Sequence, residues 1–231
     1  MHNAGIFLRF YGTTLGKKVV MALTGSYMLL FIGVHMLGNL QIFLPDREGR
    51  AALDLYAELL KASPPVLWGN RLLLLLAVGL HVLSAVLLTW RSWAARPIEY
   101  QQTKRVETTL AARTMRWGGV VLAGFIVLHL LHFTVGTLHP DGLAGGFDAG
   151  AVRHNVVVGF SSVLVAAGYL VVMVLVGLHA SHGAWSLFQT LGLEHPAYNG
   201  WRRVFATAFS LLVAGGFMAV PAAVLLQLIQ G

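Results

Sequence analysis

The chain has no cysteine among its 231 residues, and only 11% of those residues are charged. Without cysteine it can form no disulfide, bind no iron–sulfur cluster through its own thiolates and use no thiolate nucleophile. Soluble domains carry about 25% charged residues, so the low charge argues against an ordinary water-soluble fold. Acidic residues are especially few, nine against 16 Lys and Arg, which gives a net charge of +7. Because the basic residues lie between apolar segments, we expect them to report membrane orientation and expect no nucleic acid partner.

Apolar residues make up 57% of the chain, and the mean hydropathy is +0.72. These values indicate an integral membrane protein. The N-terminal stretch has neither a short apolar core nor a small-residue cleavage site, so no cleaved signal peptide is expected. A hydrocarbon layer about 30 Å thick needs roughly 20 apolar residues of helix. Five segments meet this length: 19–44, 68–93, 116–138, 156–188 and 204–229. The sequence therefore predicts an all-α membrane protein with one domain over 1–231 and five transmembrane helices.

The fourth segment is longer than one crossing needs, and we expect it to tilt or to project beyond the bilayer.

Basic residues predict the orientation of the five segments. The N-terminal end and the connections 91–116 and 189–203 hold 11 of the 16 Lys and Arg residues. The connections 45–67 and 139–155 hold six of the nine acidic residues. Positively charged loops stay in the cytoplasm, so the N-terminus is predicted inside and the C-terminus outside.

Four histidines lie one in each of the first four apolar segments: His35, His81, His129 and His179. An ionisable side chain inside hydrocarbon costs free energy and is rarely kept without a partner or a function. Imidazole is the usual nitrogen ligand of haem iron, and a six-coordinate electron-transfer haem takes two. Four imidazoles would therefore hold two haems. Any one of them alone could instead be a structural hydrogen-bonding residue between helices.

Depth within the membrane pairs these histidines. With a rise of 1.5 Å per residue, His35 and His129 lie roughly 27 and 20 Å from the inner edge. His81 and His179 each lie about 15 Å from that edge. The sequence therefore predicts an outer haem between His35 and His129 and an inner haem between His81 and His179. Each pair would bridge two helices separated by one neighbour, across a bundle of the first four helices.

Further histidines leave alternatives open. His132 and His182 each follow a candidate ligand by three residues, on nearly the same face of the helix. Depth does not exclude His132, whereas His182 would lie nearer the inner surface and fits less well. His139 and His154 lie in or near the outer connections, where solvated loop residues are the default expectation.

Three segments resemble a known family. The first span contains LGKKVVMALTGSYMLLFIGVHMLGNL, the third RTMRWGGVVLAGFIVLHLLHF and the fourth LHASHGAWSLFQTLG. They resemble the cytochrome b subunit that anchors succinate dehydrogenase and fumarate reductase in the membrane, in its single-chain, five-helix, two-haem bacterial form. The resemblance covers nearly the whole chain and is most specific in the first and fourth spans. In the second span it amounts to a histidine within an apolar run.

The resemblance implies a set of haem ligands. In this family they are a histidine four residues before Asn, a mid-span histidine of helix two, a histidine ten residues after Gly, and the first histidine of His-x-x-x-Gly-x-Trp. The matching positions are His35, His81, His129 and His179. The pattern thus favours His129 over His132 and His179 over His182. One departure is Gly177, where some menaquinol-using members carry a glutamate proposed as a proton path.

The resemblance also implies the partners and the reaction. A flavoprotein subunit would oxidise succinate to fumarate, and an iron–sulfur subunit would carry the electrons to the membrane. This chain would pass them through two haems b to a quinone, menaquinone by resemblance, as part of respiratory complex II in the bacterial cytoplasmic membrane. It would contribute the haem and quinone end of the enzyme, with no catalytic residue for the dicarboxylate.

The quinone site is less defined. A quinone needs an apolar slot and hydrogen-bonding groups, and the shortest electron path ends on the inner, basic face. Polar residues that could line such a slot or pair with haem propionates are Lys17, Lys18, Thr24, Ser26, Arg116, His132 and His182, with Tyr11 beside them. Lys17 and Arg116 are also typical lipid-headgroup anchors. An outer quinone site near His139 and His154 stays open.

Two other functions compete with this interpretation. The chain could be the haem b subunit of another quinone-linked complex, such as a hydrogenase or formate dehydrogenase, although the KKVVMALTG and HGAWS stretches argue against it. It could also be a haem-free transporter that relays protons through histidines. Transporters commonly show internal repeats and helices broken at mid-membrane, whereas here only Pro221 interrupts a span. Glycines within the spans, among them Gly25 and Gly119, could make room for porphyrin but more often allow close helix packing.

Overall fold

The computed structural model describes the chain except for residues 1, 48, 96–108, 141–145 and 230–231. It is 84% helical, and the described residues form no β-sheet. The α-helices are α1 His2–Gly12, α2 Thr14–Asn39, α3 Ala52–Lys61, α4 Pro64–Ala94, α5 Leu110–Leu130, α6 Val152–Ser161, α7 Val163–Thr190 and α8 Asn199–Leu225. Short 3-10 helices cover Leu40–Phe43 and Pro196–Tyr198, and a π-helical turn covers Leu131–Val135.

Five helical segments of the described chain are long and apolar enough to cross a membrane: Thr14–Phe43, Pro64–Ala94, Leu110–Val135, Val163–Thr190 and Pro196–Leu225. The prediction of an all-α protein with five helices long and apolar enough to span a membrane is therefore confirmed. The helix ends differ from the apolar segments because capping groups, not hydropathy, decide where a helix begins. Thr13 accepts a hydrogen bond from Gly16 N at 2.9 Å, and Thr109 accepts one from Ala112 N at 3.1 Å. These caps start the first and third spans five and six residues before the predicted 19 and 116.

The fourth apolar segment is not one helix, and the prediction of a single long helix over 156–188 was wrong. Ser162 has φ −75° and ψ 116°, an extended conformation that separates α6 from α7. The Ser161 hydroxyl, on the last residue of α6, donates a hydrogen bond to Val157 O at 2.7 Å. Most residues of α6 from Asn155 to Phe160 are buried. Val163 and Leu164, at the start of α7, are exposed. The residues beyond the length of one membrane crossing thus form a short separate helix, α6.

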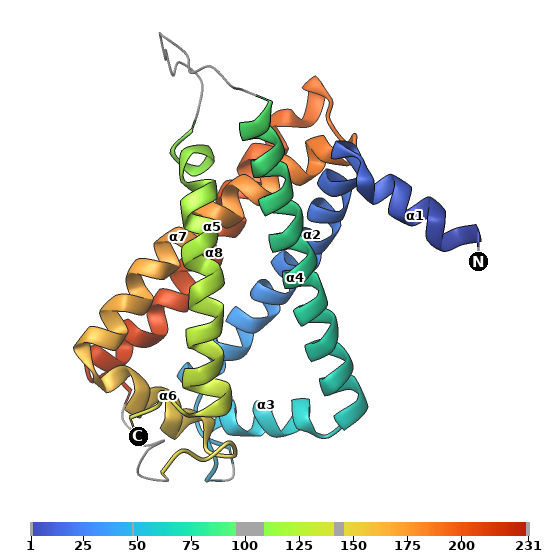
Figure 1. Ribbon diagram of the computed structural model, residues 1–231. Helices are drawn as coiled ribbons and strands as arrows, with labels where there is room; N and C mark the ends of the chain where they lie inside the picture. The colour runs from blue at the N-terminus through green and yellow to red at the C-terminus, as the bar shows by residue number, and fades with distance from the viewer. Residues whose placement is uncertain (1, 48, 96–108, 141–145, 230–231) are drawn as a thin grey trace.

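The long helices run between two ends of the molecule (Figure 1). We call one the α1 end: α1 lies there, α2, α5 and α8 begin there, and α4 and α7 finish there. The opposite end, which we call the α3 end, holds α3 and α6. α2 packs against both α4 and α7, and α7 packs against α2, α5 and α8. α2 therefore lies between α4 and α7, and α7 lies between α2 and α5.

Close packing differs along the molecule. The main hydrophobic cluster lies at the α3 end, where Ile42, Leu53, Phe160 and Val220 from four different segments meet. Small residues let α7 approach α8, since a Cβ on Gly177 would lie 3.1 Å from Ala214 Cβ. Gly177 therefore faces α8, and a side chain at this position would crowd Ala214.

Candidate functional site

The four histidines of the sequence prediction lie as two couples inside the helix bundle. His35 on α2 and His129 on α5 have ring centroids 5.9 Å apart, with ring planes at 77°. His81 on α4 and His179 on α7 have ring centroids 6.3 Å apart, with planes at 57°. The structure thus brings together the same partners that membrane depth pairs. Their role as ligands stays a prediction.

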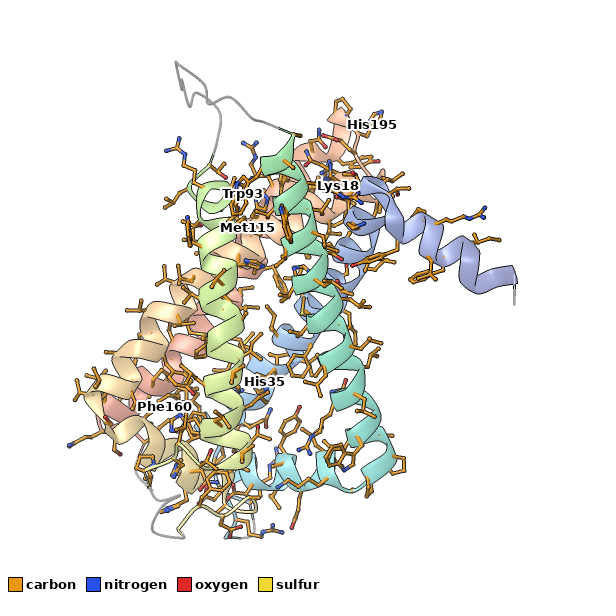
Figure 2. All side chains as sticks on the ribbon, in the orientation of Figure 1. Lys18, His35, Trp93, Met115, Phe160 and His195 are labelled. Atoms are coloured by element: carbon orange, nitrogen blue, oxygen red, sulfur yellow. The ribbon has the colours of Figure 1, made fainter. Side chains whose placement is uncertain are left out.

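Each couple bridges helices that have another helix between them. α7 lies between α2 and α5, which hold His35 and His129, and α2 lies between α4 and α7, which hold His81 and His179. Along the helices, His81 and His179 are roughly 17–20 Å from the α1 end, and the other two are roughly 29–32 Å from it. We call His81 and His179 the proximal couple and His35 and His129 the distal couple. Figure 2 labels His35 within the bundle.

The spacing within each couple fits an iron atom between two imidazoles. A metal lies about 2.0 Å from an imidazole nitrogen, and the ring centroid lies roughly 1.1 Å behind that nitrogen, so two ligating rings have centroids about 6.2 Å apart. The observed 5.9 and 6.3 Å are close to this value. Neither couple gathers a third His, Cys, Asp or Glu ligand among the described residues. Two axial imidazoles leave four coordination positions, which is the number that a porphyrin supplies.

The His81 ring of the proximal couple is positioned by contacts with α2. His81 Nδ1 lies 3.1 Å from Met21 O and 3.2 Å from Thr24 Oγ1. A Cβ on Gly25 would lie 3.3 Å from His81 Cε1, and a Cβ on Gly119 would lie 3.9 Å from His179 Cε1. These two glycines therefore lie beside the candidate ligand rings. The Nδ1 atom of His179 is buried with no partner among the described residues.

The distal couple lies among aromatic rings. Phe31 stacks on His35 at 5.4 Å and 9°, and Phe217 lies 5.6 Å from it. His35 Nε2 is 3.4 Å from Asn39 Nδ2, a contact that His35 would give up on binding iron through that atom. Asn39 would keep its 2.8 Å hydrogen bond to His35 O. His129 Nδ1 is buried without a partner among the described residues. Leaving a buried polar atom without a hydrogen bond destabilises a protein by about 1–3 kcal/mol. Such atoms are found at functional sites, among them sites that bind a ligand.

The structure also separates the candidates from their neighbours. His132 is buried, with its Nδ1 3.0 Å from Tyr169 Oη, and its ring lies 5.6 Å from that of His139. His129, not His132, therefore faces His35. His182 is half-buried, and the ring that faces His81 belongs to His179.

Lys17 and Ser26, two of the predicted polar candidates, form hydrogen bonds to backbone carbonyl oxygens. Lys17 is buried, and its ammonium donates to Tyr11 O at 2.7 Å and to Gly12 O at 3.2 Å. It thus caps the C-terminus of α1, where a cation is favoured by the helix dipole. The Ser26 hydroxyl donates to Ala22 O at 2.9 Å within its own helix. Tyr11 Oη lies 3.1 Å from Ser84 Oγ and ties α1 to α4.

The other candidates at the α1 end lie on its surface. Lys18 is exposed and is labelled at this end of the molecule in Figure 2. Arg116 is exposed as well, with its guanidinium 5.8 Å from the Trp93 ring. These two cations are positioned for lipid headgroups or for a ligand at the membrane surface.

Sequence reasoning missed a buried arginine at this end. Arg202 counts toward the positive charge in the sequence, but only 5% of it is exposed. Its guanidinium donates to Asn199 Oδ1 and, at 3.4 Å, to Trp185 O, and it lies 4.5 Å from the Trp185 ring. This arginine therefore holds the tryptophan of the HGAWS segment in place. No sequence signal marks the contact, because α7 and α8 meet there only in the folded chain.

The expectation that His139 is a solvated loop residue was wrong. It is 2% exposed, and its Nε2 lies 2.8 Å from Asn155 O. Asn155 in turn donates from Nδ2 to Asp148 O at 2.6 Å, so hydrogen bonds link the start of α6 both to His139 and to the described residues just before the helix. His154 is exposed, as expected. Loop position alone cannot reveal such burial, which depends on how the connection covers the bundle.

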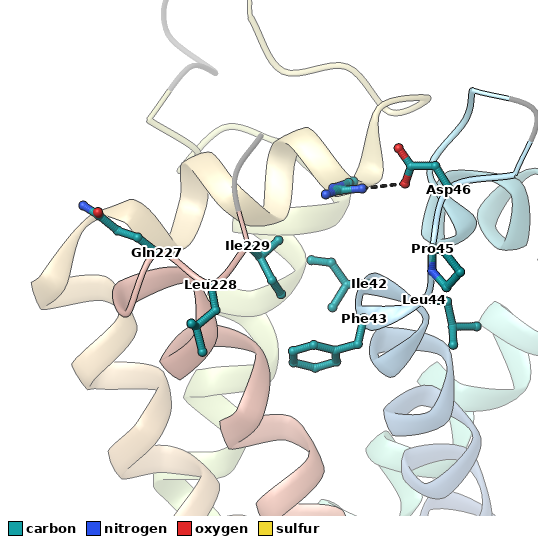
Figure 3. A pocket seen from close by; sticks show the side chains of 9 residues that line it. Ile42, Phe43, Leu44, Pro45, Asp46, Gln227, Leu228 and Ile229 are labelled. Atoms are coloured by element: carbon teal, nitrogen blue, oxygen red, sulfur yellow. Dashed lines mark hydrogen bonds and ion pairs between the residues drawn. The ribbon is translucent and has the colours of Figure 1, made fainter.

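A surface depression of about 770 Å³ also lies at the α3 end (Figure 3). An ion pair between Arg153 and Asp46, 2.7 Å long, closes one side of it. Its other walls are mostly apolar side chains from two chain segments, Ile42–Pro45 and Gln227–Ile229. It includes none of the four histidines.

Comparison with models of known protein families, with curated proteins and with solved structures finds no match for this chain. The functional argument therefore depends on the residues and on the geometry of the two couples.

Proposed function

We propose that this chain is the membrane anchor subunit of a succinate:quinone oxidoreductase and passes electrons between an iron–sulfur subunit and a quinone through two haems b. The supporting observation is the arrangement of four half-buried histidines as two couples, each with ring centroids at the separation that one iron atom requires. The motif resemblance around these histidines supports the particular enzyme.

In this proposal His35 and His129 hold the outer haem, and His81 and His179 hold the inner one. When bound, the haems supply one-electron transfer at two depths of the membrane. The chain's own part is to orient the imidazoles, to keep water away and to tune the reduction potentials by hydrogen bonds and burial. Phe31 and Phe125, which lie within 5.4 and 5.8 Å of the distal rings, provide that apolar surrounding.

The α1 end would face the cytoplasm and the iron–sulfur subunit. Most Lys and Arg residues belong to this end by sequence, and those described there include the exposed Lys18, Arg91 and Arg116. A docking surface for the iron–sulfur subunit and the shortest electron path to the inner haem would then coincide. The chain would lie in the bacterial cytoplasmic membrane, with a flavoprotein as the third subunit and menaquinone as the proposed quinone.

Haem content tests this proposal. We expect the detergent-purified chain to give two haems b per polypeptide in a pyridine haemochrome assay. His35→Ala and His129→Ala should each lose the same haem, and His81→Ala and His179→Ala the other, because each couple holds one iron. His132→Ala and His182→Ala are the matched controls and should retain both haems. A colourless wild-type chain, or one saturated by a single haem, would contradict the proposal.

The whole complex tests the enzyme assignment. Membranes containing the chain with its co-purified subunits should reduce quinone with electrons from succinate. A two-haem protein whose complex oxidises hydrogen or formate instead would be the cytochrome of another quinone-linked enzyme.

A further inference from the structure

The ring of His81 is in contact with one turn of a neighbouring helix. Its Nδ1 atom lies between two oxygen atoms of α2, Met21 O at 3.1 Å and Thr24 Oγ1 at 3.2 Å. Thr24 is close enough because its own hydroxyl is anchored to the helix, donating to Val20 O at 2.8 Å. The histidine on α4 is therefore seated against the α2 turn from Met21 to Gly25.

These contacts determine which nitrogen of His81 carries the proton. A carbonyl oxygen such as Met21 O only accepts hydrogen bonds. The one hydroxyl proton of Thr24 is directed to Val20 O, so Thr24 Oγ1 also presents a lone pair to the ring. Both neighbours are then acceptors, and Nδ1 must be the donor. Nε2 is left with a free lone pair, the form of imidazole that binds a metal.

Gly25 provides the space for this seat. A Cβ at this position would lie 3.3 Å from His81 Cε1 and 3.6 Å from its Nδ1. That approach is tighter than ordinary van der Waals contact, so the ring would have to move by a few tenths of an ångström. The absence of a side chain at Gly25 therefore lets the imidazole approach the α2 backbone this closely.

His179, the partner of His81, and His129 of the distal couple have no comparable hydrogen bond to a neighbouring backbone. His179 Nδ1 and His129 Nδ1 are both buried without a partner among the described residues. Among these three rings, the hydrogen bond to a neighbouring backbone carbonyl therefore distinguishes His81.

We propose that Thr24 and Gly25 are positioning residues for the inner haem: they hold the His81 ring so that Nδ1 donates to Met21 O and Nε2 faces His179. This inference rests on the proposed function. A hydrogen bond from Nδ1–H to a carbonyl makes the imidazole a stronger donor to the metal. A stronger donor stabilises ferric over ferrous iron, so the seat lowers the reduction potential of the inner haem.

Redox titration of the purified full-length chain tests the proposal. Each haem is assigned from the single-haem spectra of His129→Ala and His179→Ala. We expect Thr24→Val, which keeps the shape of the side chain and removes its hydroxyl, to raise the potential of the inner haem alone. Gly25→Ala should do the same by displacing the ring from Met21 O. Thr24→Ser should restore the wild-type potential, and both haems should remain bound in all three variants.

Thr114→Val is the matched control, because it makes the same change at a threonine whose hydroxyl donates to Leu110 O at 3.1 Å, within its own helix α5. It should leave both potentials unchanged. The proposal is overturned if Thr24→Val and Gly25→Ala leave the inner potential at its wild-type value, move both potentials together, or shift it no more than Thr114→Val does. A wild-type chain without haem would instead contradict the proposed function, so the two failures are distinguishable.

Discussion

Polar side chains within the spans mostly serve the backbone. Lys17 caps α1, Ser26 bonds the preceding turn of its own helix, and Thr24 bonds both its own helix and His81. Hydrocarbon offers no water to these groups, so each must find a protein acceptor. The residue types that suggested a propionate or quinone site are thus partly accounted for by hydrogen bonds that the sequence does not reveal.

Neighbouring lysines provide a prediction at this scale. Lys17→Met removes the ammonium that bonds Tyr11 O and Gly12 O, and it should loosen α1 from the bundle. We expect the melting temperature in detergent to fall by about 2–4 °C. Limited proteolysis should also cut sooner within His2–Gly12. Lys18→Met, one residue further along, removes an exposed cation and should leave both measurements unchanged.

Among the elements, hydropathy located the five crossings but not their ends. The caps at Thr13 and Thr109 start two spans earlier than apolarity indicates, and Ser162 divides the fourth segment. The third span ends in a π-helical turn followed by Gly136 in a left-handed conformation, with φ +84°. Such turns are local backbone events, and a hydropathy pattern averages over them.

Gly136 is the basis of a prediction about this end of α5. An added Cβ would overlap the ring of Phe147, and positive φ is strained for any residue with a side chain. We expect Gly136→Ala to destabilise the protein by about 1–3 kcal/mol, measured by thermal or denaturant unfolding in detergent. Gly124→Ala, where a Cβ meets nothing within 4 Å, is the control. A Gly136→Ala protein as stable as that control would contradict the strained turn.

At the scale of the whole molecule, the bundle has two chemically different ends. The α1 end holds most of the basic connections, and the α3 end holds α3, α6 and the main hydrophobic cluster. The two histidine couples lie at different heights between them. This polarity is what would let one end meet a cytoplasmic partner and the other end face outward.

The lack of native cysteine makes the orientation directly testable. Single substitutions Ser63→Cys at the α3 end and Leu193→Cys at the α1 end place one thiol at an exposed position on each side. In intact cells, a membrane-impermeant maleimide should label Ser63→Cys and not Leu193→Cys; permeabilised cells should label both. The reverse pattern would place the N-terminus outside.

The amino-acid sequence by itself determined the five apolar helices that are long enough to cross a membrane and the four histidines within them, because spanning a bilayer requires apolar length and makes each ionisable residue conspicuous. Even the pairing of those histidines followed from helix rise alone. Only the tertiary structure decided which backbone atoms the rings contact, that His139 and Arg202 are buried, and that α6 separates from α7. Those features depend on contacts between atoms from different segments of the chain. A hydropathy pattern along the sequence does not contain information about such contacts.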